Sequence, residues 1–196
     1  MGRAGARKIS LLLASLTLGG CALLRPAPVR QPAAAPRPTL SADTLGTSQI
    51  ARQVVHAAFG ERDATLQCVL QVTPERIALV ALNAVGLRLF SVTVANGQTT
   101  VERAPGVPDN VQPERILADI QLAYWPLAAL QTAYAGTDWN VTEPFTGTRR
   151  LLHDGRLAEE VHYAQNTDDH WQGRLWLSNF EFGYSLAVDS QPLEVR

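Results

Sequence analysis

The fold is indicated most directly by residues 87–103, which have the sequence LRLFSVTVANGQTTVER. Apolar and polar side chains alternate through its first half, a pattern that is typical of a strand with one buried face. The pair Asn96-Gly97 then separates this run from a second one. Because a type I′ turn needs positive φ at both central residues, Asn-Gly between two such runs predicts a tight hairpin. The stretch therefore predicts two antiparallel strands.

Similar short runs, rich in β-branched or alternating apolar residues, occur on both sides of this hairpin. They are residues 65–72, 76–83, 140–143, 149–153, 157–164, 171–178 and 184–189. The pair Asp154-Gly155 predicts another tight hairpin. Residues 50–59 fit either a helix face or an irregular strand. Because helices and strands do not alternate along the chain, the strands are expected to form an antiparallel sheet.

The middle of the chain has the period of a helix instead. Apolar residues recur at three- and four-residue spacing within residues 113–122, and a proline opens the segment. Pro126 disfavours helical geometry at Trp125, so a second helix is predicted over residues 127–135. Two helices between two groups of strands predict an α+β fold.

A short apolar leader precedes a cysteine at the start of the chain. Basic residues stand ahead of the apolar run 9–18, which would rise only about 15 Å as a helix, and small residues follow it. The motif Leu18-Gly19-Gly20-Cys21 resembles the bacterial lipobox. This resemblance implies a lipoprotein signal peptide at residues 1–20 and acylation of Cys21. Ala22, in place of Asp, then implies sorting to the cell outer membrane, facing the periplasm.

The chain after the leader is expected to have two parts. Residues 21–45 hold the lipidated cysteine and a proline- and alanine-rich tether, a composition that cannot pack a core, and residues 46–196 form the folded domain. The full chain has 17 basic and 18 acidic residues, and the leader holds three of the basic ones, so its removal leaves a net charge of −4. This balance argues against nucleic-acid binding, which needs a basic surface.

The sequence has no nucleophile elbow and no glycine-rich phosphate loop. Asp168-Asp169-His170 comes nearest to a metal cluster, and we interpret it as a solvated turn. Glu159-Glu160 are adjacent on a predicted strand and should point to opposite faces, which makes them a poor acid/base pair. A hydrolase would need His153, His162 or His170 to meet a carboxylate in a pocket. We expect no enzyme activity, no cofactor and no metal.

A few further residues carry separate hypotheses. Acylation of Cys21 would leave Cys68 without an intramolecular partner, and its apolar surroundings predict a buried structural thiol. Arg149, Arg150 and Arg156 either contact a lipid phosphate through their planar guanidinium groups or keep the outer face of the sheet soluble.

The order of elements resembles that of the LolA/LolB-like lipoprotein localisation family over roughly residues 49–191. Residues 86–90 (GLRLF) and 117–126 (LADIQLAYWP) look more specifically like an uncharacterised LolB-related family of bacterial outer-membrane lipoproteins. The resemblance implies a curved antiparallel sheet, an incomplete β-barrel, with helices covering the open concave side and an interior that receives acyl chains. It also implies a membrane-delivery loop at residues 83–86, in which Val85 takes the place of an exposed leucine.

A bent sheet with helices as a lid has room for an apolar ligand cavity. We expect this cavity to be lined by Leu79, Ala81, Phe90, Val92, Ile116, Ile120, Trp125, Leu130, Tyr163, Trp176 and Tyr184. The alternative is that the same residues fill a solid core.

The expected function is therefore that of a non-enzymatic outer-membrane lipoprotein. It would bind acyl chains of a lipid or lipoprotein and act in envelope lipid or lipoprotein transfer or localisation, with the membrane and a periplasmic carrier protein as partners. The alternative is a protein-interaction module of an envelope or lipid/polyene biosynthesis complex. Such a module would dock through its sheet edge or through the Tyr124-Trp125 surface and would bind no ligand.

Overall fold

The computed structural model describes residues 37–107, 112–164 and 169–194 of the 196-residue chain. The chain divides into two units, residues 1–35 and 36–196, and every described residue belongs to the second unit. The predicted signal peptide, Cys21 and the chain up to residue 36 lie outside the described residues. No helix in the described ranges is long and apolar enough to cross a membrane.

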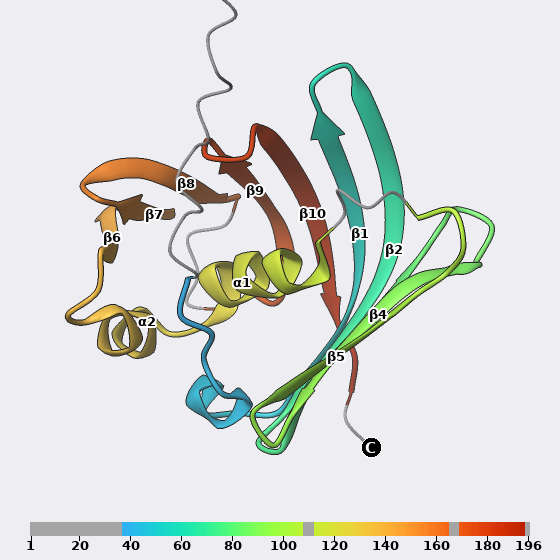
Figure 1. Ribbon diagram of the computed structural model, residues 1–196, viewed down its shortest axis with the longest axis horizontal. Helices are drawn as coiled ribbons and strands as arrows, with labels where there is room; N and C mark the ends of the chain where they lie inside the picture. The colour runs from blue at the N-terminus through green and yellow to red at the C-terminus, as the bar shows by residue number, and fades with distance from the viewer. Residues whose placement is uncertain (1–36, 108–111, 165–168, 195–196) are drawn as a thin grey trace, which may run out of the picture. The chain divides into compact units, whose positions relative to one another are not determined.

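Ten strands form one antiparallel sheet (Figure 1). They are β1 (Gln49–Phe59), β2 (Arg62–Thr73), β3 (Arg76–Leu82), β4 (Arg88–Ala95), β5 (Gln98–Arg103), β6 (Trp139–Phe145), β7 (Thr148–His153), β8 (Arg156–Tyr163), β9 (Gly173–Asn179) and β10 (Tyr184–Pro192). Their order across the sheet is β5-β4-β3-β2-β1-β10-β9-β8-β7-β6. The sheet thus consists of two five-stranded meanders, which the pairing of the first strand with the last joins into one.

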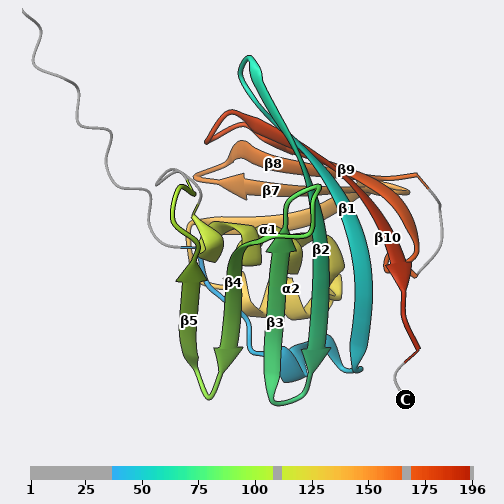
Figure 2. The same ribbon diagram turned by 90° about the vertical axis from the view of Figure 1, so that its right-hand side faces the viewer.

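Two helices connect the opposite edges of this sheet. Helices α1 (Pro113–Tyr124) and α2 (Leu127–Tyr134) follow edge strand β5 and precede edge strand β6, so the chain must cross from one edge to the other. The sheet curves around α1, which lies across its concave side (Figures 1 and 2). The prediction of an α+β fold, with a curved antiparallel sheet and helices over its open side, is confirmed.

Local sequence signals place the turns and the helix break. Asn96 and Gly97 have φ of 52° and 71°, and Asp154-Gly155 has the same pattern, so both predicted hairpins are present. Trp125 is extended, with φ −75° and ψ 150°, as the proline after it requires. Residues 50–59, which the sequence left open, belong to a strand because β1 pairs along its length with both β2 and β10.

The folded domain begins earlier than the sequence indicated. We expected the tether to extend to residue 45, but Leu40, Ala42 and Leu45 are buried in the core, the last two in the short 3₁₀-helix η1 (Ala42–Leu45). We call residues 37–45 the strap. Its three apolar side chains are scattered among polar residues and one proline, a composition that is typical of a solvated linker.

Candidate functional site

A cavity of about 440 Å³ lies between the concave face of the sheet and helix α1. This volume is within the range of roughly 300–1,000 Å³ that is usual for small-molecule sites. Side chains of β1 to β4, β9 and β10 form its wall, which is mainly apolar. Its aliphatic members include Val55, Leu66, Leu79, Leu177, Leu186 and Val188. A wall of this kind suits a ligand that is itself apolar.

The wall follows from the periodicities of the elements. Alternate residues of a strand face the same side, so residues 53, 55, 57 and 59 of β1 all reach the cavity. Five residues of α1 line the cavity and share one face of the helix at spacings of three and four: Ile116, Asp119, Ile120, Ala123 and Tyr124. One face of α1 therefore closes the cavity.

The cavity meets solvent near the hairpin between β1 and β2. Phe59, Arg62 and Asp63 belong to the lining and are exposed, as are Pro105 and Gly106 after β5. The aromatic ring of Phe59 packs against that of Tyr184, with 5.3 Å between centroids. The opening thus combines an aromatic ring with one residue of each charge.

Two polar residues of the cavity lining, Gln53 and Tyr124, form hydrogen bonds with each other and with buried Ser190. The Gln53 amide donates to the Tyr124 hydroxyl at 2.8 Å and to Ser190 Oγ at 2.9 Å, and the two hydroxyls are 2.8 Å apart. Burial raises the pKa of Tyr124, so the phenol stays protonated. These groups already have partners, which leaves the apolar wall as the dominant feature.

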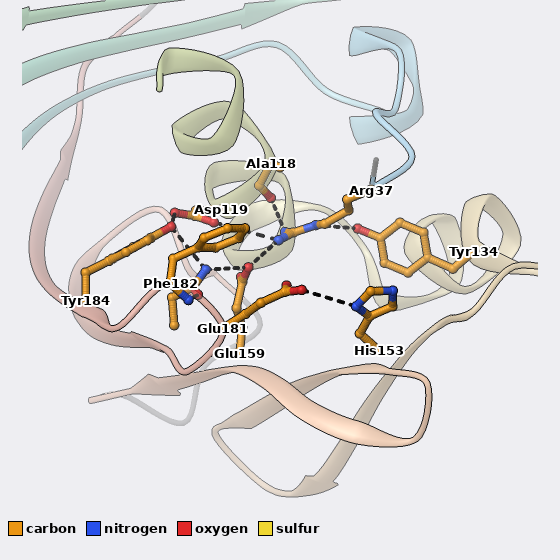
Figure 3. Close-up of polar contacts among 10 residues, drawn as sticks. Arg37, Ala118, Asp119, Tyr134, His153, Glu159, Glu181, Phe182 and Tyr184 are labelled. Carbon is orange, nitrogen blue, oxygen red and sulfur yellow. Dashed lines mark hydrogen bonds and ion pairs between the residues drawn. The ribbon is translucent and has the colours of Figure 1, made fainter. Parts of the chain in front are cut away.

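A buried charged cluster joins α1 to the strap and to β8, and one of its members, Asp119, also lines the cavity (Figure 3). Arg37, in the strap, donates from Nη1 to Glu159 Oε1 of β8 at 2.6 Å, and its Nη1 lies 3.7 Å from Asp119 Oδ1 of α1. It also donates from Nε to the Tyr134 hydroxyl at 3.1 Å and from Nη2 to the Ala118 carbonyl. One arginine thus connects the strap, both helices and the sheet.

The two carboxyl groups of the cluster face each other. Burial raises the pKa of Asp119, and the charge of Glu159 raises it further, whereas Arg37 opposes the effect of burial at Glu159. Asp119 Oδ1 and Glu159 Oε2 accept no hydrogen bond from a donor in the described residues, and the two groups are within hydrogen-bonding reach of each other. One shared proton would satisfy both oxygens and leave the cluster neutral with Arg37.

Other groups hold the two carboxyls from the side. The Tyr184 hydroxyl donates to Asp119 Oδ2, and Asn179 donates to Glu159 Oε1 at 2.8 Å. One of the two held carboxyls is on α1 and the other is on β8. The cluster therefore joins β8 to the helix that closes the cavity.

The predicted cavity residues occupy three different environments. Leu79, Phe90, Ile116 and Ile120 line the cavity. Ala81, Val92, Trp125 and Leu130 lie outside the lining and are buried in the surrounding core. The two tyrosines make polar contacts beside it: Tyr163 donates to the Ala123 carbonyl at 2.6 Å, and Tyr184 contacts Asp119.

Trp176 is the one predicted cavity residue on the outer face of the sheet. Its side chain is 43 % exposed, while its neighbours Leu175 and Leu177 point inward and line the cavity. Strand alternation forces this result, because two inward leucines put the residue between them outside. The prediction that Trp176 lines the cavity is wrong.

Val85 stands at the tip of the turn between β3 and β4. It is 79 % exposed. The side-chain oxygen of Asn83 accepts hydrogen bonds from the backbone N–H groups of Val85 and Leu87, at 3.1 and 2.9 Å, and so fixes the turn. The tip also exposes Leu87. The turn thus presents two aliphatic side chains to solvent.

The histidines do not assemble a hydrolase site. His153 pairs with Glu181 at 3.3 Å, and His162 pairs with Glu160 at 2.7 Å. His170 stacks on Tyr163. The cavity lining among the described residues includes no histidine, and the same ranges contain no group of three side chains placed to bind a metal.

Two surface hypotheses are wrong at particular residues, namely Arg149 and the pair Tyr124-Trp125. Arg149 is buried, and donates to Glu143 and to the carbonyls of Leu122 and Trp125, so it is not available to a lipid phosphate. Tyr124 and Trp125 are buried as well and form no docking surface. Arg150 pairs with Glu160 and is partly exposed.

Sequence reasoning missed the charged cluster altogether. Arg37 was assigned to the tether, and Glu159 was considered only with its neighbour Glu160. Asp119 carried a usable signal, since an acidic residue stands on the otherwise apolar face of a predicted helix. That pattern indicates a buried carboxyl with a partner, but it does not identify the partner.

Comparison with known proteins identifies the family. Residues 50–192 match the model of a family described as "Protein of unknown function (DUF3261)". The chain belongs to this family. No curated protein matches the sequence of this family member.

Three solved structures are similar to this DUF3261 protein. A LolA superfamily protein from Nitrosomonas europaea has 9% identity and a TM-score of 0.47, with 80% of this chain and 90% of that chain covered. A DUF1329 family protein from Desulfovibrio piger has 11% identity and a TM-score of 0.35, over 76% and 87%. An outer membrane lipoprotein-sorting protein domain from Vibrio parahaemolyticus has 12% identity and a TM-score of 0.37, over 74% and 83%.

Proposed function

We propose that this DUF3261 protein is a non-enzymatic carrier or acceptor that holds an acyl chain of a lipid or lipoprotein in the cavity under α1. The observation that carries the proposal is the mainly aliphatic wall of a 440 Å³ cavity that opens to solvent. Each methylene group transferred from water to such a wall contributes about 0.8 kcal/mol. An acyl chain therefore needs no polar chemistry to bind.

The anchor and the location belong to the same proposal. Acylation of Cys21 would attach the protein to the periplasmic face of the outer membrane, where lipids or lipoproteins would enter or leave the cavity, received from a periplasmic carrier protein. Two or more acyl chains give a stable anchor. We expect Cys21→Ser to move the protein from the membrane to the soluble fraction, and mass spectrometry of the unaltered protein to show acyl groups on residue 21. Unmodified Cys21 in membrane-bound protein would contradict the anchor.

The turn at Val85 is proposed to assist delivery. Its exposed aliphatic side chains at Val85 and Leu87 can enter the interfacial layer of a bilayer without rearrangement of the sheet. Val85→Asp should slow transfer of bound ligand to vesicles and leave binding in solution unchanged. Equal transfer rates for the unaltered protein and the variant would remove this role.

Ligand binding is tested with cis-parinaric acid, a fluorescent fatty acid, and residues 22–196, which contain the whole described unit. Ala57→Phe adds a ring inside the cavity, whereas Ala187→Phe makes the same change at a position outside the lining. Displacing only two methylenes of ligand costs about 1.6 kcal/mol, a little over tenfold in affinity. We expect saturable binding that Ala57→Phe weakens by this factor and that Ala187→Phe leaves unchanged.

Two results would overturn the proposal. One is the absence of saturable binding to the unaltered protein. The other is equal weakening by both variants, because the outer-face change does not reach the cavity. Capture of a single stoichiometric protein with no lipid would instead favour the interaction module, docked through the exposed edge strand β5.

A further inference from the structure

Helix α1 lies between the cavity and the strap. Ile116, Ile120, Ala123 and Tyr124 line the cavity, Ala118 and Gln121 contact the strap, and Asp119 does both. The two groups belong to different faces of the same helix. Helix α1 therefore cannot move away from the cavity unless the strap is displaced.

The strap contacts α1 at two points along the helix and at a third just after its last residue. The Arg37 guanidinium donates to the Ala118 carbonyl, and the Gln121 side chain both accepts from Leu40 N at 2.9 Å and donates to Leu40 O at 2.7 Å. Just past the helix, Trp125 Nε1 donates to Thr44 Oγ1 at 2.8 Å. These contacts are largely buried, so water does not readily replace them.

The charged cluster is the part of this contact that responds to its surroundings. Asp119 is on α1 and Glu159 is on β8, so ionisation of both places two negative charges across the boundary between the helix and the sheet. Arg37 neutralises only one of them. The charges in a buried site are weakly screened, so their repulsion acts to separate α1 from β8.

The titratable or charged groups around the pair come from every element that packs there. They are Arg37 of the strap, Arg115 of α1, Tyr134 of α2, His153 of β7, Glu181 in the turn after β9, and Tyr184 of β10. Figure 3 shows Glu181 directed to His153, with which it pairs. Arg37 is thus the cation that directly bonds either carboxyl of the pair among the described residues.

We propose that Arg37 is a positioning residue for the ligand, through which the strap and the Asp119–Glu159 pair hold α1 closed over the cavity. Release of the strap lets α1 lift so that an acyl chain enters or leaves. Ionisation of the second carboxyl favours this release, and the exchange of ligand is therefore faster at higher pH. This inference rests on the proposed binding of an acyl chain in the cavity.

The test measures two quantities on residues 22–196. Hydrogen exchange of the α1 amides reports opening of the helix without ligand, and stopped-flow fluorescence reports release of cis-parinaric acid. Arg37→Met removes the charged contact, and Gln121→Leu releases the strap at Leu40 without changing any charge. Arg174→Met is the matched control, because Arg174 pairs with Asp189 on the outer face and is half exposed.

We expect Arg37→Met and Gln121→Leu to speed both α1 amide exchange and probe release by about tenfold or more, since each removes buried hydrogen bonds to α1. Arg174→Met should change neither rate. If Arg37→Met does not fold, the amide exchange and probe release of Gln121→Leu test the proposal instead. Variants that bind the probe but release it at the unaltered rate would overturn the positioning role alone, whereas failure of the unaltered protein to bind the probe would overturn the proposed function.

The pH profile separates this role from a merely structural one. The release rate of the unaltered protein should rise with pH, and that of Asp119→Asn, which mimics the protonated carboxyl, should stay flat. Arg37→Lys should release the probe more slowly than Arg37→Met, because lysine keeps the charge. It should still release the probe faster than the unaltered protein, because lysine lacks the planar set of donors of a guanidinium. Equal pH profiles for the unaltered protein and Asp119→Asn would overturn the role of the pair.

Discussion

Arg149 completes the end of α1, and its replacement should destabilise the domain. The carbonyl of Leu122 would normally accept from the N–H four residues later, but residue 126 is proline and has none. Arg149 Nη1 supplies the missing donor at 2.6 Å and also donates to the Trp125 carbonyl at 2.8 Å. Arg149→Met leaves both carbonyls buried and without this partner.

The magnitude follows from these two bonds. A hydrogen bond that involves a charged group contributes about 1.5–3 kcal/mol, so the loss of two costs about 3 kcal/mol or more. The pair with Glu143 adds little, because that side chain is 36% exposed and solvent screens it. We therefore expect the free energy of unfolding to fall by about 3 kcal/mol.

Urea denaturation followed by circular dichroism measures this difference on residues 22–196. Arg174→Met removes a bidentate but half-exposed ion pair and should cost no more than about 1 kcal/mol. Arg149→Lys, which keeps the charge on a narrower donor group, should fall between the two. A loss below about 1 kcal/mol for Arg149→Met would refute the assignment of Arg149 as the donor that ends α1.

Three further predictions concern single residues. The pKa of Asp119 is raised above its ordinary 3.8 in the folded state, so its proton stabilises the fold at low pH, and that stabilisation is lost as the pH rises through the folded-state pKa. The free energy of unfolding of Asp119→Asn should lack this decline with pH. Parallel pH curves for the unaltered protein and the variant would contradict the prediction. Burial raises the pKa of Cys68 to about 12, which keeps the thiol protonated and unreactive. In a chain that lacks Cys21, a polar thiol reagent should therefore label Cys68 only when the protein unfolds. Rapid labelling of the native protein would show that the cavity wall is open to the reagent. Gly97 has φ +71° with open space around it, so Gly97→Ala should lower the free energy of unfolding by about 1 kcal/mol through backbone strain alone. An unchanged urea denaturation curve would show that the turn relaxes.

The cavity prediction shows how far strand periodicity reaches. Alternation identifies which residues share a face, but it does not say which face is concave. Trp176 is predicted from the sequence to lie inside, whereas its neighbours Leu175 and Leu177 belong to the opposite face of the same strand. The structure decides between them, because curvature and the crossing of α1 cover only one side of the sheet.

The charged cluster shows a second limit. Arg37 and Glu159 are 122 residues apart in sequence, and Arg37 and Ala118 are 81 apart. Neither spacing leaves a local pattern. Only the joining of β1 to β10 and the passage of the strap beneath α1 bring these groups together.

The sequence by itself determined the elements and their class. The local signals are the Asn-Gly and Asp-Gly turns, the proline after Trp125, and the change from two-residue to helical periodicity. Each depends on residues within a few positions of each other, so it can be identified without knowledge of the fold. Tertiary structure alone decided which strand face lines a cavity, where the domain begins, and that Arg37, Asp119 and Glu159 meet. The physical reason is that burial and charge pairing depend on contacts between distant segments, whereas turns and helix breaks depend on local backbone geometry.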